Sequence, residues 1–357
     1  MPQYTESQLH EVLKNQFGFN AFRPGQLEAI MALLNHGELL CIQPTGHGKS
    51  LLYQLPATLL EGVVLVISPL IALMRDQLEQ LKNRFHISAA SINSDQGEEE
   101  NQNVRRIVQE ARVKILFVSP EQLDHIDRFQ FLLSLPISLI VVDEAHCIST
   151  WGHDFRPSYR QIIHLVKALR DKSHDIKILG LTATANAKTE EDIKQQLSQE
   201  AKKIIVYREN MNRPNIQLSV VKAKSVGEKL LILEKIIQQL EGVGLIYCAT
   251  QDNTELVAEY LKTKNIHAAS YHAGYEAEIK QKLQRDFLNN QFKVIAATNA
   301  LGMGIDKSDL RFIIHFDIPG SITAYYQEVG RCGRDGLPAK GILLYHFEDT
   351  KIQEHFI

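Results

Sequence analysis

The sequence predicts an α/β protein with two domains, each a mostly parallel sheet flanked by helices. The first observation is length, because 357 residues exceed what one hydrophobic core usually supports. The second is a recurring pattern in which a short apolar run ends in small polar residues and leads into a helical segment. Such repetition indicates parallel strands covered by helices.

The composition is that of an ordinary globular protein. No apolar run approaches the roughly 20 residues of a membrane-spanning helix, and the N-terminus lacks a secretory signal. The net charge of −3 gives no overall attraction to nucleic acid, so a local groove must provide any such binding. The isolated cysteines argue against disulfides and structural zinc. We expect all four to be small buried residues: Cys41, Cys147, Cys248 and Cys332.

Two helices are predicted before the first strand. Residues 5–16 suit a short helix N-capped by Thr5 or Ser7, and residues 27–34 suit a second helix that follows a Pro-Gly turn. Aromatic, Arg and Gln side chains between the two helices could sandwich and hydrogen-bond a purine ring. The alternative is a hydrophobic staple at a helix start.

A phosphate-binding loop is predicted at residues 43–50. An apolar strand precedes it and a helical pattern follows, so backbone N–H groups and the helix N-terminus can converge on phosphate oxygens. Lys49 would reach the β- and γ-phosphates, and the Ser50 hydroxyl would ligate Mg²⁺. Gln43 departs from the usual first glycine of this pattern. The predicted nucleotide contacts in the loop are those of Thr45, Gly46, Gly48, Lys49 and Ser50.

A pair of carboxylates is the second chemical signal in this half of the chain. Strands are predicted at residues 39–42, 63–67, 113–118, 139–142 and 176–181. Ligands of such sheets bind at the carboxyl ends of the strands. Asp143 follows one of these strands and is placed to hold Mg²⁺ through water. Its neighbour Glu144 can polarise an attacking water as a general base.

The second domain is predicted to supply positive charge. A polar, Pro-containing connector near residues 208–215 divides the chain into domains 1–208 and 209–357. Further strands are predicted at 243–250, 268–274, 293–299 and 310–316, with helices at 252–263 and 276–290. Arg331 and Arg334, each flanked by glycine, suit a finger directed at the γ-phosphate across a cleft. Closure with ATP and opening after hydrolysis would make the pair of domains a motor.

These motifs resemble the superfamily 2 helicases and, within them, closely the RecQ family. The resemblance covers roughly residues 10–347. Its most specific part is the aromatic-rich stretch at residues 147–159. The other matching stretches are 17–26, 143–146, 182–184, 302–307 and 327–336. The resemblance implies two tandem RecA-like domains with the ATP site in the interdomain cleft. It also implies an ATP-dependent 3′–5′ DNA helicase that hydrolyses ATP in DNA recombination and repair.

The resemblance also implies residue roles. Phe19 would stack on adenine with Arg23 and Gln26 near it, and Gln327 would contact the nucleotide. In the aromatic-rich stretch, side chains would stack on bases or contact phosphate, with Tyr159 as a further stacking face. The residues implied to contact nucleic acid are Ser68, Arg75, Trp151, His153, Phe155, Arg156 and Thr298. Gln122 and Cys332 stand where the family more often has Arg and Ala.

The implied cofactors are ATP and Mg²⁺, without structural zinc. The implied partners are single-stranded and branched or forked DNA, with no membrane. We expect a monomer in the cytoplasm, associated with the bacterial nucleoid. Family members usually continue into a zinc-binding helical domain and a winged helix. Because this sequence reaches Ile357 before either, we expect it to be the catalytic core of a longer protein, with a naturally minimal family member as the alternative.

Two alternatives stay open. One is an RNA helicase of the DEAD/DEAH-box kind, which the aromatic-rich stretch and the Phe/Arg/Gln element disfavour. The other is a nucleotide-gated module that clamps DNA without unwinding it. A DNA-versus-RNA comparison of ATPase stimulation distinguishes the first alternative, and a fork-unwinding assay distinguishes the second.

Overall fold

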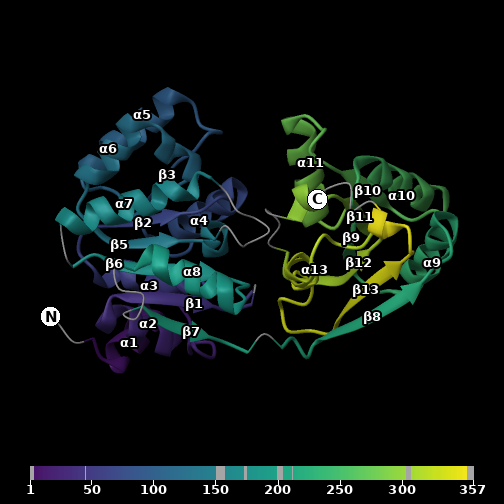
Figure 1. Cartoon of the computed structure of the whole chain (residues 1–357), viewed down its shortest axis with the longest axis horizontal. Helices are drawn as coiled ribbons and strands as arrows, with labels where there is room; N and C mark the ends of the chain where they lie inside the picture. The colour runs from purple at the N-terminus through teal and green to yellow at the C-terminus, as the bar shows by residue number, and fades with distance from the viewer. Residues whose placement is uncertain are drawn as a thin grey trace. The chain divides into compact units, whose positions relative to one another are not determined.

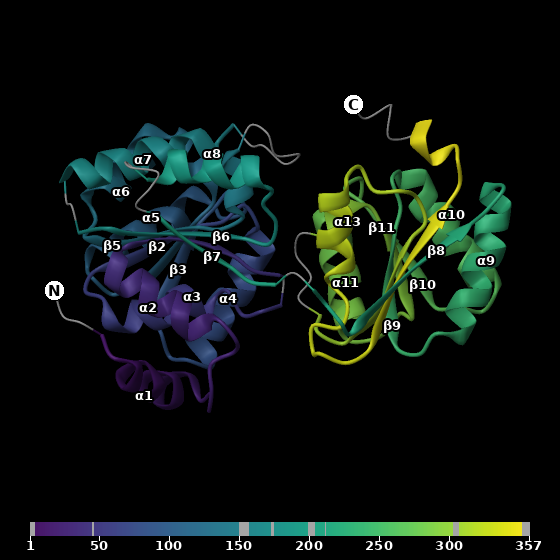
Figure 2. The ribbon, with the colours of Figure 1, turned by 60° about the horizontal axis from the view of Figure 1, so that its bottom comes forward.

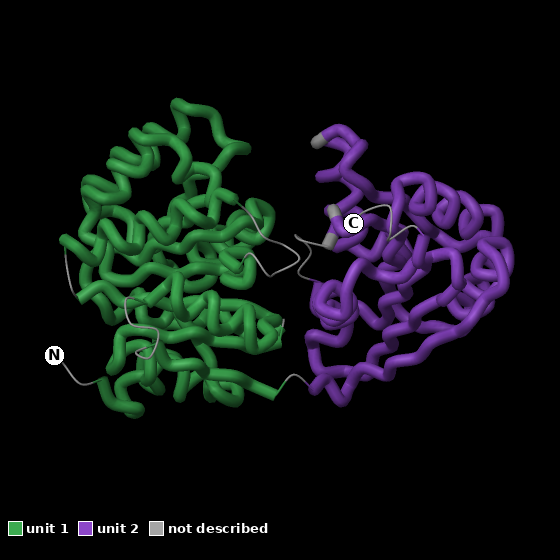
Figure 3. The backbone as a smooth tube through the Cα atoms, viewed as in Figure 1, with its two compact units in different colours: residues 1–211 green, residues 212–357 purple. Residues whose placement is uncertain are grey.

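The chain folds into two compact units. The computed structural model describes residues 4–44, 46–149, 157–172, 175–198, 204–210, 212–302 and 307–351. Unit 1 comprises residues 1–211 and unit 2 comprises residues 212–357 (Figure 3). The division lies close to the predicted boundary at 208/209.

Unit 1 is built on a parallel sheet. Within the described residues it has seven strands in the order β3-β4-β2-β5-β6-β1-β7 (Figure 1). The strands are β1 (Glu38–Ile42), β2 (Val63–Ile67), β3 (Ala89–Ile92), β4 (Ile115–Val118), β5 (Ile137–Val142), β6 (Lys177–Thr182) and β7 (Ile205–Arg208). Strands β2 and β4 are buried along their whole length, which explains their uninterrupted apolar sequences. The predicted fold class is confirmed for this unit.

Helices cover both faces of this sheet. They are α1 (Glu6–Phe17), α2 (Gln26–His36), α3 (Leu51–Leu59), α4 (Ile71–Asn83), α5 (Glu98–Gln109), α6 (Ile126–Ser134), α7 (Tyr159–Lys172) and α8 (Ala187–Leu197), with short 3₁₀ helices η1 (Pro120–Asp124) and η2 (Ala145–Ile148). Helices α1 to α4 lie on one face, and α5 to α8 on the other (Figure 2). Successive strand residues therefore enter different cores, as Leu65 and Val66 do. Thr5, not Ser7, caps α1, in a capping box with Gln8.

Unit 2 repeats this architecture. Its described residues form a six-stranded parallel sheet in the order β10-β11-β9-β12-β13-β8. The strands are β8 (Ile216–Lys222), β9 (Val243–Tyr247), β10 (Ala268–Tyr271), β11 (Val294–Ala297), β12 (Leu310–His315) and β13 (Ala339–Tyr345). The helices are α9 (Val226–Gln239), α10 (Gln251–Thr263), α11 (Ala277–Leu288), α12 (Asn299–Gly302) and α13 (Ile322–Val329). Helices α9 and α10 pack on one face, while α11 and α13 lie on the other (Figure 2).

A lysine closes the amino-terminal edge of each sheet. Lys114, before β4, donates to the carbonyl oxygen of Gly62 at 3.0 Å, and Lys293, before β11, donates to that of Leu240. Burial lowers the pKa of both ammonium groups. In both units these lysines lie at the edge opposite the carboxyl ends of the strands, where the predicted chemistry is found.

The structure also bears on the four cysteines. Cys41, Cys147, Cys248 and Cys332 are all buried and unpaired, which confirms the prediction that they are small core residues. In the part of the chain that the structure describes, no helix has both the length and the apolar character needed to cross a bilayer.

Candidate functional site

The phosphate loop has the expected strand–turn–helix setting between β1 and α3. Gly46 and Gly48 have φ angles of 83° and 77°, which side chains disfavour. The Lys49 ammonium donates to the carbonyl oxygens of Gln43 at 2.8 Å and Pro44 at 3.4 Å. The charge that would bind phosphate therefore lies against the first turn of the loop. The side-chain amide of Gln43 is buried and makes no hydrogen bond with the described residues, whereas its backbone N–H donates to the Thr182 carbonyl oxygen at 3.1 Å.

The element upstream of α2 is tied directly to the phosphate loop. Gln26 is buried, accepts from the Arg23 amide at 2.8 Å and donates to the carbonyl oxygens of His47 at 3.3 Å and Gly48 at 3.0 Å. The Arg23 guanidinium donates to the Gly46 carbonyl oxygen at 2.5 Å. Both side chains thus contact the loop in this structure. Their predicted contacts with the base stay predictions.

Phe19 lies at the edge of the same region. Its ring packs edge-on against Phe85, with 6.2 Å between centroids, and the Arg84 guanidinium lies 5.2 Å from its centroid. The ring is half-buried, so part of its surface is accessible to a ligand. Stacking of Phe19 on adenine stays a prediction.

Asp143 is held at the carboxyl ends of two neighbouring strands. Ser68 follows β2 and donates its hydroxyl to Asp143 Oδ2 at 3.0 Å, while the Glu144 amide donates to Oδ1 at 3.0 Å. Burial and the charge of Glu144 raise the pKa of Asp143 from its usual 3.8 to about 6, against the lowering effect of Lys49. Lys49 is therefore close enough to act on this carboxylate. A cation that binds to Asp143 would lower the free-energy cost of keeping this buried carboxylate ionised.

We expect Asp143→Asn to stabilise the nucleotide-free protein at pH 8 by about 1–3 kcal/mol. The pKa of about 6 in the folded state exceeds the usual 3.8, so folding favours the protonated carboxyl. The destabilisation is thus complete above pH 6 and disappears as the pH falls toward 4. Urea unfolding in EDTA between pH 5 and pH 8 measures this dependence. Asp95→Asn, at an exposed ion pair, controls for the lost charge, and a pH-independent difference would contradict the prediction.

Glu144 starts a polar chain that runs away from Asp143. Its backbone is left-handed, with φ 48°, which is unusual for a non-glycine residue and typical of functional sites. Glu144 Oε2 lies 3.3 Å from His146 Nδ1 and makes no hydrogen bond with the described residues. The same His146 nitrogen lies 3.0 Å from Thr182 Oγ1, which accepts from the Thr184 amide at 3.2 Å. The chain links the carboxylate pair to the segment after β6.

In unit 2, Arg331 and Arg334 lie in the turn after α13. Burial raises the pKa of Tyr247 at the end of β9 to about 12, and the charges of both arginines oppose that rise. Both guanidinium groups are therefore near the Tyr247 ring. Gln327 is half-buried on α13. The structure thus places Arg331 and Arg334 around one side chain of unit 2, and their predicted action on the nucleotide stays a prediction, as does that of Gln327.

A buried histidine–glutamate pair beside Tyr247 was not predicted from the sequence. His315 at the end of β12 is fully buried, and its Nε2 lies 2.8 Å from Glu328 Oε2 on α13. The His315 ring stacks on Tyr247, with 5.4 Å between centroids. The pair fixes α13 to the carboxyl edge of the sheet. The sequence feature that could have indicated this pair is a histidine at the end of an apolar strand.

Part of the predicted nucleic-acid surface lies outside the described residues. The residues concerned are Trp151, His153, Phe155 and Arg156, and Thr45, which was predicted to contact the nucleotide instead, also lies outside the described residues. Arg75 is exposed on α4 and pairs with Asp95 at 2.8 Å, while Thr298 is half-buried after β11. Ser68 is buried and holds Asp143, so the structure supports a nucleotide-side role for it. The contacts of all these residues with nucleic acid stay predictions.

The interpretation of Tyr159 as a stacking face was wrong. Its side chain is fully buried in the core, and its hydroxyl donates to the Asp143 carbonyl oxygen at 3.1 Å. The residue begins α7, so it faces the sheet and supports the turn after β5. Gln122, which departs from the family pattern, is also buried and accepts from Arg128.

Two family models match the chain. "DEAD/DEAH box helicase" covers residues 23–193, and "Helicase conserved C-terminal domain" covers residues 228–336. The ATP-dependent DNA helicase RecQ of Haemophilus influenzae is 43% identical over 338 residues, which are 95% of this chain and 53% of that protein. The probable ATP-dependent DNA helicase RecS of Bacillus subtilis is 42% identical, over 98% of this chain and 69% of that protein. The chain thus spans about half to two thirds of these relatives.

Solved helicase structures share the fold. The Mycobacterium smegmatis helicase Lhr bound to ssDNA and AMP-PNP matches 96% of this chain and 48% of that one, with a TM-score of 0.75 and 20% identity. The helicase Mss116p bound to ssRNA and AMP-PNP matches 99% of this chain and 77% of that one, with a TM-score of 0.78 and 18% identity. At such identities the likeness shows the two RecA-like folds alone.

Proposed function

Because this chain belongs to the RecQ family of DNA helicases, we propose that it is the ATP-driven motor of a 3′–5′ DNA helicase. The observation that carries the proposal is the Ser68–Asp143 hydrogen bond at the ends of neighbouring strands, within the field of Lys49 on the phosphate loop. A lysine, a carboxylate and a glycine-rich helix start are what the binding and hydrolysis of a nucleoside triphosphate require.

The donor set fits magnesium bound together with a nucleotide. Among the described residues, no three His, Cys, Asp or Glu side chains gather to form a metal site of their own. Mg²⁺ in nucleotide sites usually keeps several waters and takes one or two carboxylates plus phosphate oxygens. Asp143, through water, and the Ser50 hydroxyl are such donors. When bound, the ion would neutralise charge on the β- and γ-phosphates.

The protein's own groups carry the rest of the proposed hydrolysis. Lys49 leaves its loop carbonyl contacts and binds the phosphates, and Glu144 takes a proton from the attacking water. Arg331 and Arg334 supply charge to the γ-phosphate as it is transferred. The Glu144–His146–Thr182 contacts offer a route by which the presence of that phosphate reaches the segment after β6.

DNA is the proposed track of the motor. Trp151 and Phe155 would stack on bases, and His153 and Arg156 would contact the backbone beside the carboxylates. Arg75 and Thr298 would add contacts to the strand. Binding of this kind tolerates any sequence and weakens with salt. The proposed substrates are single-stranded and forked DNA in recombination and repair of nucleoid DNA, handled by a monomer.

Steady-state ATP hydrolysis without nucleic acid, with single-stranded DNA and with single-stranded RNA tests this function. We expect DNA to stimulate hydrolysis and RNA to stimulate it far less. Loss of one stacked base is worth roughly 1–3 kcal/mol, so Trp151→Ala should raise the DNA concentration for half-stimulation about 5- to 150-fold. Phe347→Ala removes another exposed aromatic ring and should have no effect.

The other outcomes identify the alternatives. Equal stimulation by RNA would indicate an RNA helicase. ATP-dependent DNA affinity without stimulation or fork unwinding would indicate a nucleotide-gated clamp. An unwinding assay on forks with 3′ or 5′ single-stranded tails tests the polarity.

A further inference from the structure

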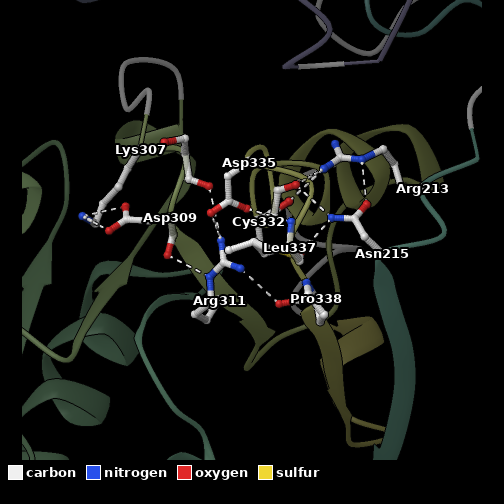
Figure 4. A network of polar contacts seen from close by, with 11 residues as sticks. Arg213, Asn215, Lys307, Asp309, Arg311, Cys332, Asp335, Leu337 and Pro338 are labelled. Carbon is white, nitrogen blue, oxygen red and sulfur yellow. Dashed lines mark hydrogen bonds and ion pairs between the residues drawn. The ribbon is translucent and has the colours of Figure 1, made fainter.

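Residues 330–337, which we call the arginine loop, are held by an arginine from the first residues of unit 2. Arg213 precedes β8 and donates to three backbone carbonyl oxygens of the loop (Figure 4). Its Nη1 bonds the oxygen of Gly330 at 3.1 Å, and its Nη2 bonds those of Cys332 at 3.1 Å and Gly333 at 2.8 Å. One guanidinium thus fixes peptide groups on either side of Arg331.

Asn215 continues the same clamp two residues later. Its Nδ2 donates to the carbonyl oxygens of Gly333 at 2.9 Å and Leu337 at 3.0 Å, and its own carbonyl oxygen accepts from the Ala339 amide at 2.8 Å. Gly333 has a φ of 60°, and a Cβ there would lie 2.5 Å from Asn215 Nδ2. Glycine is therefore required where the loop meets the clamp.

The far end of the loop is held separately. The Arg311 side chain on β12 pairs with Asp335 at 2.5 Å and donates to the Pro338 carbonyl oxygen at 3.2 Å (Figure 4). Arg311 therefore secures the exit of the loop. The carbonyl groups beside Arg331 and before Arg334 depend on Arg213 and Asn215.

This arrangement has a clear physical rationale. Carbonyl groups at the C-terminus of a helix lack partners within the helix, and α13 ends just before Gly330. The Arg213 guanidinium, with planar donors in a fixed fork, satisfies the Gly330 carbonyl oxygen at this helix end and two carbonyl oxygens of the turn that follows, and its charge complements the helix dipole. Holding the peptide groups that follow Gly330, Cys332 and Gly333 also restricts the directions in which the adjacent Arg331 and Arg334 side chains leave the backbone.

We propose that Arg213, assisted by Asn215, is a positioning residue that sets the geometry in which Arg331 and Arg334 meet the γ-phosphate. This inference rests on the proposed finger role of those two arginines. In this proposal Arg213 contacts neither the nucleotide nor DNA, and it acts through the arginine loop. Because Arg213 lies in the segment that connects the two units, a change in that segment's course would alter how the fingers are presented.

The test compares Arg213→Ala and Arg213→Lys with Arg334→Ala and with the double variant Arg213→Ala/Arg334→Ala. Lys293→Ala is the matched control, because it removes a cation-to-carbonyl bond at the opposite edge of the same sheet. For each variant, kcat and KM for ATP are measured with saturating single-stranded DNA, together with urea unfolding and binding of a fluorescent ATP analogue.

Small displacements of catalytic groups reduce rates by factors near 10², so Arg213→Ala should lower kcat roughly 10- to 100-fold. KM for ATP should change less than about twofold, because binding is left to unit 1. Arg213→Lys should recover part of the rate. The double variant should be slower than Arg334→Ala by less than the full Arg213 factor, because part of the Arg213 effect is transmitted through Arg334. Lys293→Ala should lose stability but keep its kcat.

Three results would overturn the proposal: a folded Arg213→Ala enzyme with the parental kcat, an Arg213→Lys enzyme with the parental kcat, or a double variant slower than Arg334→Ala by the full Arg213 factor. If Arg213→Ala does not fold, the kcat of Arg213→Lys can still contradict the proposal. Failure of the finger role itself is identified separately, because Arg334→Ala alone would then hydrolyse ATP at the parental rate.

Discussion

Arg334→Ala should lower DNA-stimulated kcat for ATP about 10³-fold or more and leave the affinity for ATP nearly unchanged. Charge spreads over the γ-phosphate oxygens in the transition state, and a guanidinium interacts with that charge more strongly than with the bound substrate. Arg334 lies near Tyr247 at the carboxyl edge of the unit 2 sheet, where burial raises the pKa of the phenol and keeps its hydroxyl neutral.

Single-turnover hydrolysis and equilibrium binding of a fluorescent ATP analogue measure this effect. Arg285→Ala, an exposed arginine on α11, removes the same charge from unit 2 and should leave kcat unchanged. Arg331→Ala tests the neighbouring candidate, and we expect the larger loss at Arg334. If Arg334→Ala kept the parental kcat while Arg331→Ala lost it, the finger would be Arg331.

Most strands that sequence patterns predicted are buried on both faces, although β10, at an edge, was also predicted and β13, inside its sheet, was not. Strand β2 is a continuous apolar run that only a central parallel strand accommodates, and β9 and β12 are of the same kind. The edge strand β8 was not predicted, because most of it is exposed and polar Gln217 and Ser219 alternate with its apolar residues. An edge strand has a neighbour on one side only, so its sequence is less constrained.

The candidate site likewise has parts that the sequence predicted and parts that it did not. The phosphate loop and the Asp143–Glu144 pair were predictable because their chemistry depends on neighbouring residues and a local turn. The Ser68–Asp143 bond joins residues 75 apart, and the Arg213 clamp spans 117 positions to Gly330. Such contacts depend on strand order, which no local pattern encodes. Tyr159 was misassigned for a related reason, since its loop sequence resembles an exposed turn although the side chain enters the core.

Glu144→Gln should reduce kcat for ATP by about 10²- to 10⁴-fold, the usual contribution of a general base. Gln keeps the size of the side chain but cannot take a proton. The left-handed backbone at Glu144 directs its carboxylate to a place where Oε2 makes no hydrogen bond with the described residues and lies 3.3 Å from His146. An oxygen without a hydrogen bond retains its capacity to accept one from a water molecule, and strain is expected of a residue placed for chemistry.

Because the substitution leaves Lys49, Ser50 and Asp143 in place, the variant should bind Mg-ATP as the parent does and hold single-stranded DNA in the ATP-bound state. DNA affinity measured with ATP should then match that of the parent with a non-hydrolysable analogue. Glu110→Gln, at a surface ion pair on the same unit, removes one negative charge and should hydrolyse ATP normally. A Glu144→Gln enzyme that retained more than about a tenth of the parental kcat would exclude Glu144 as the general base. In that case the proton would have to leave through another group, and His146, 3.0 Å from Thr182, would be the next residue to replace.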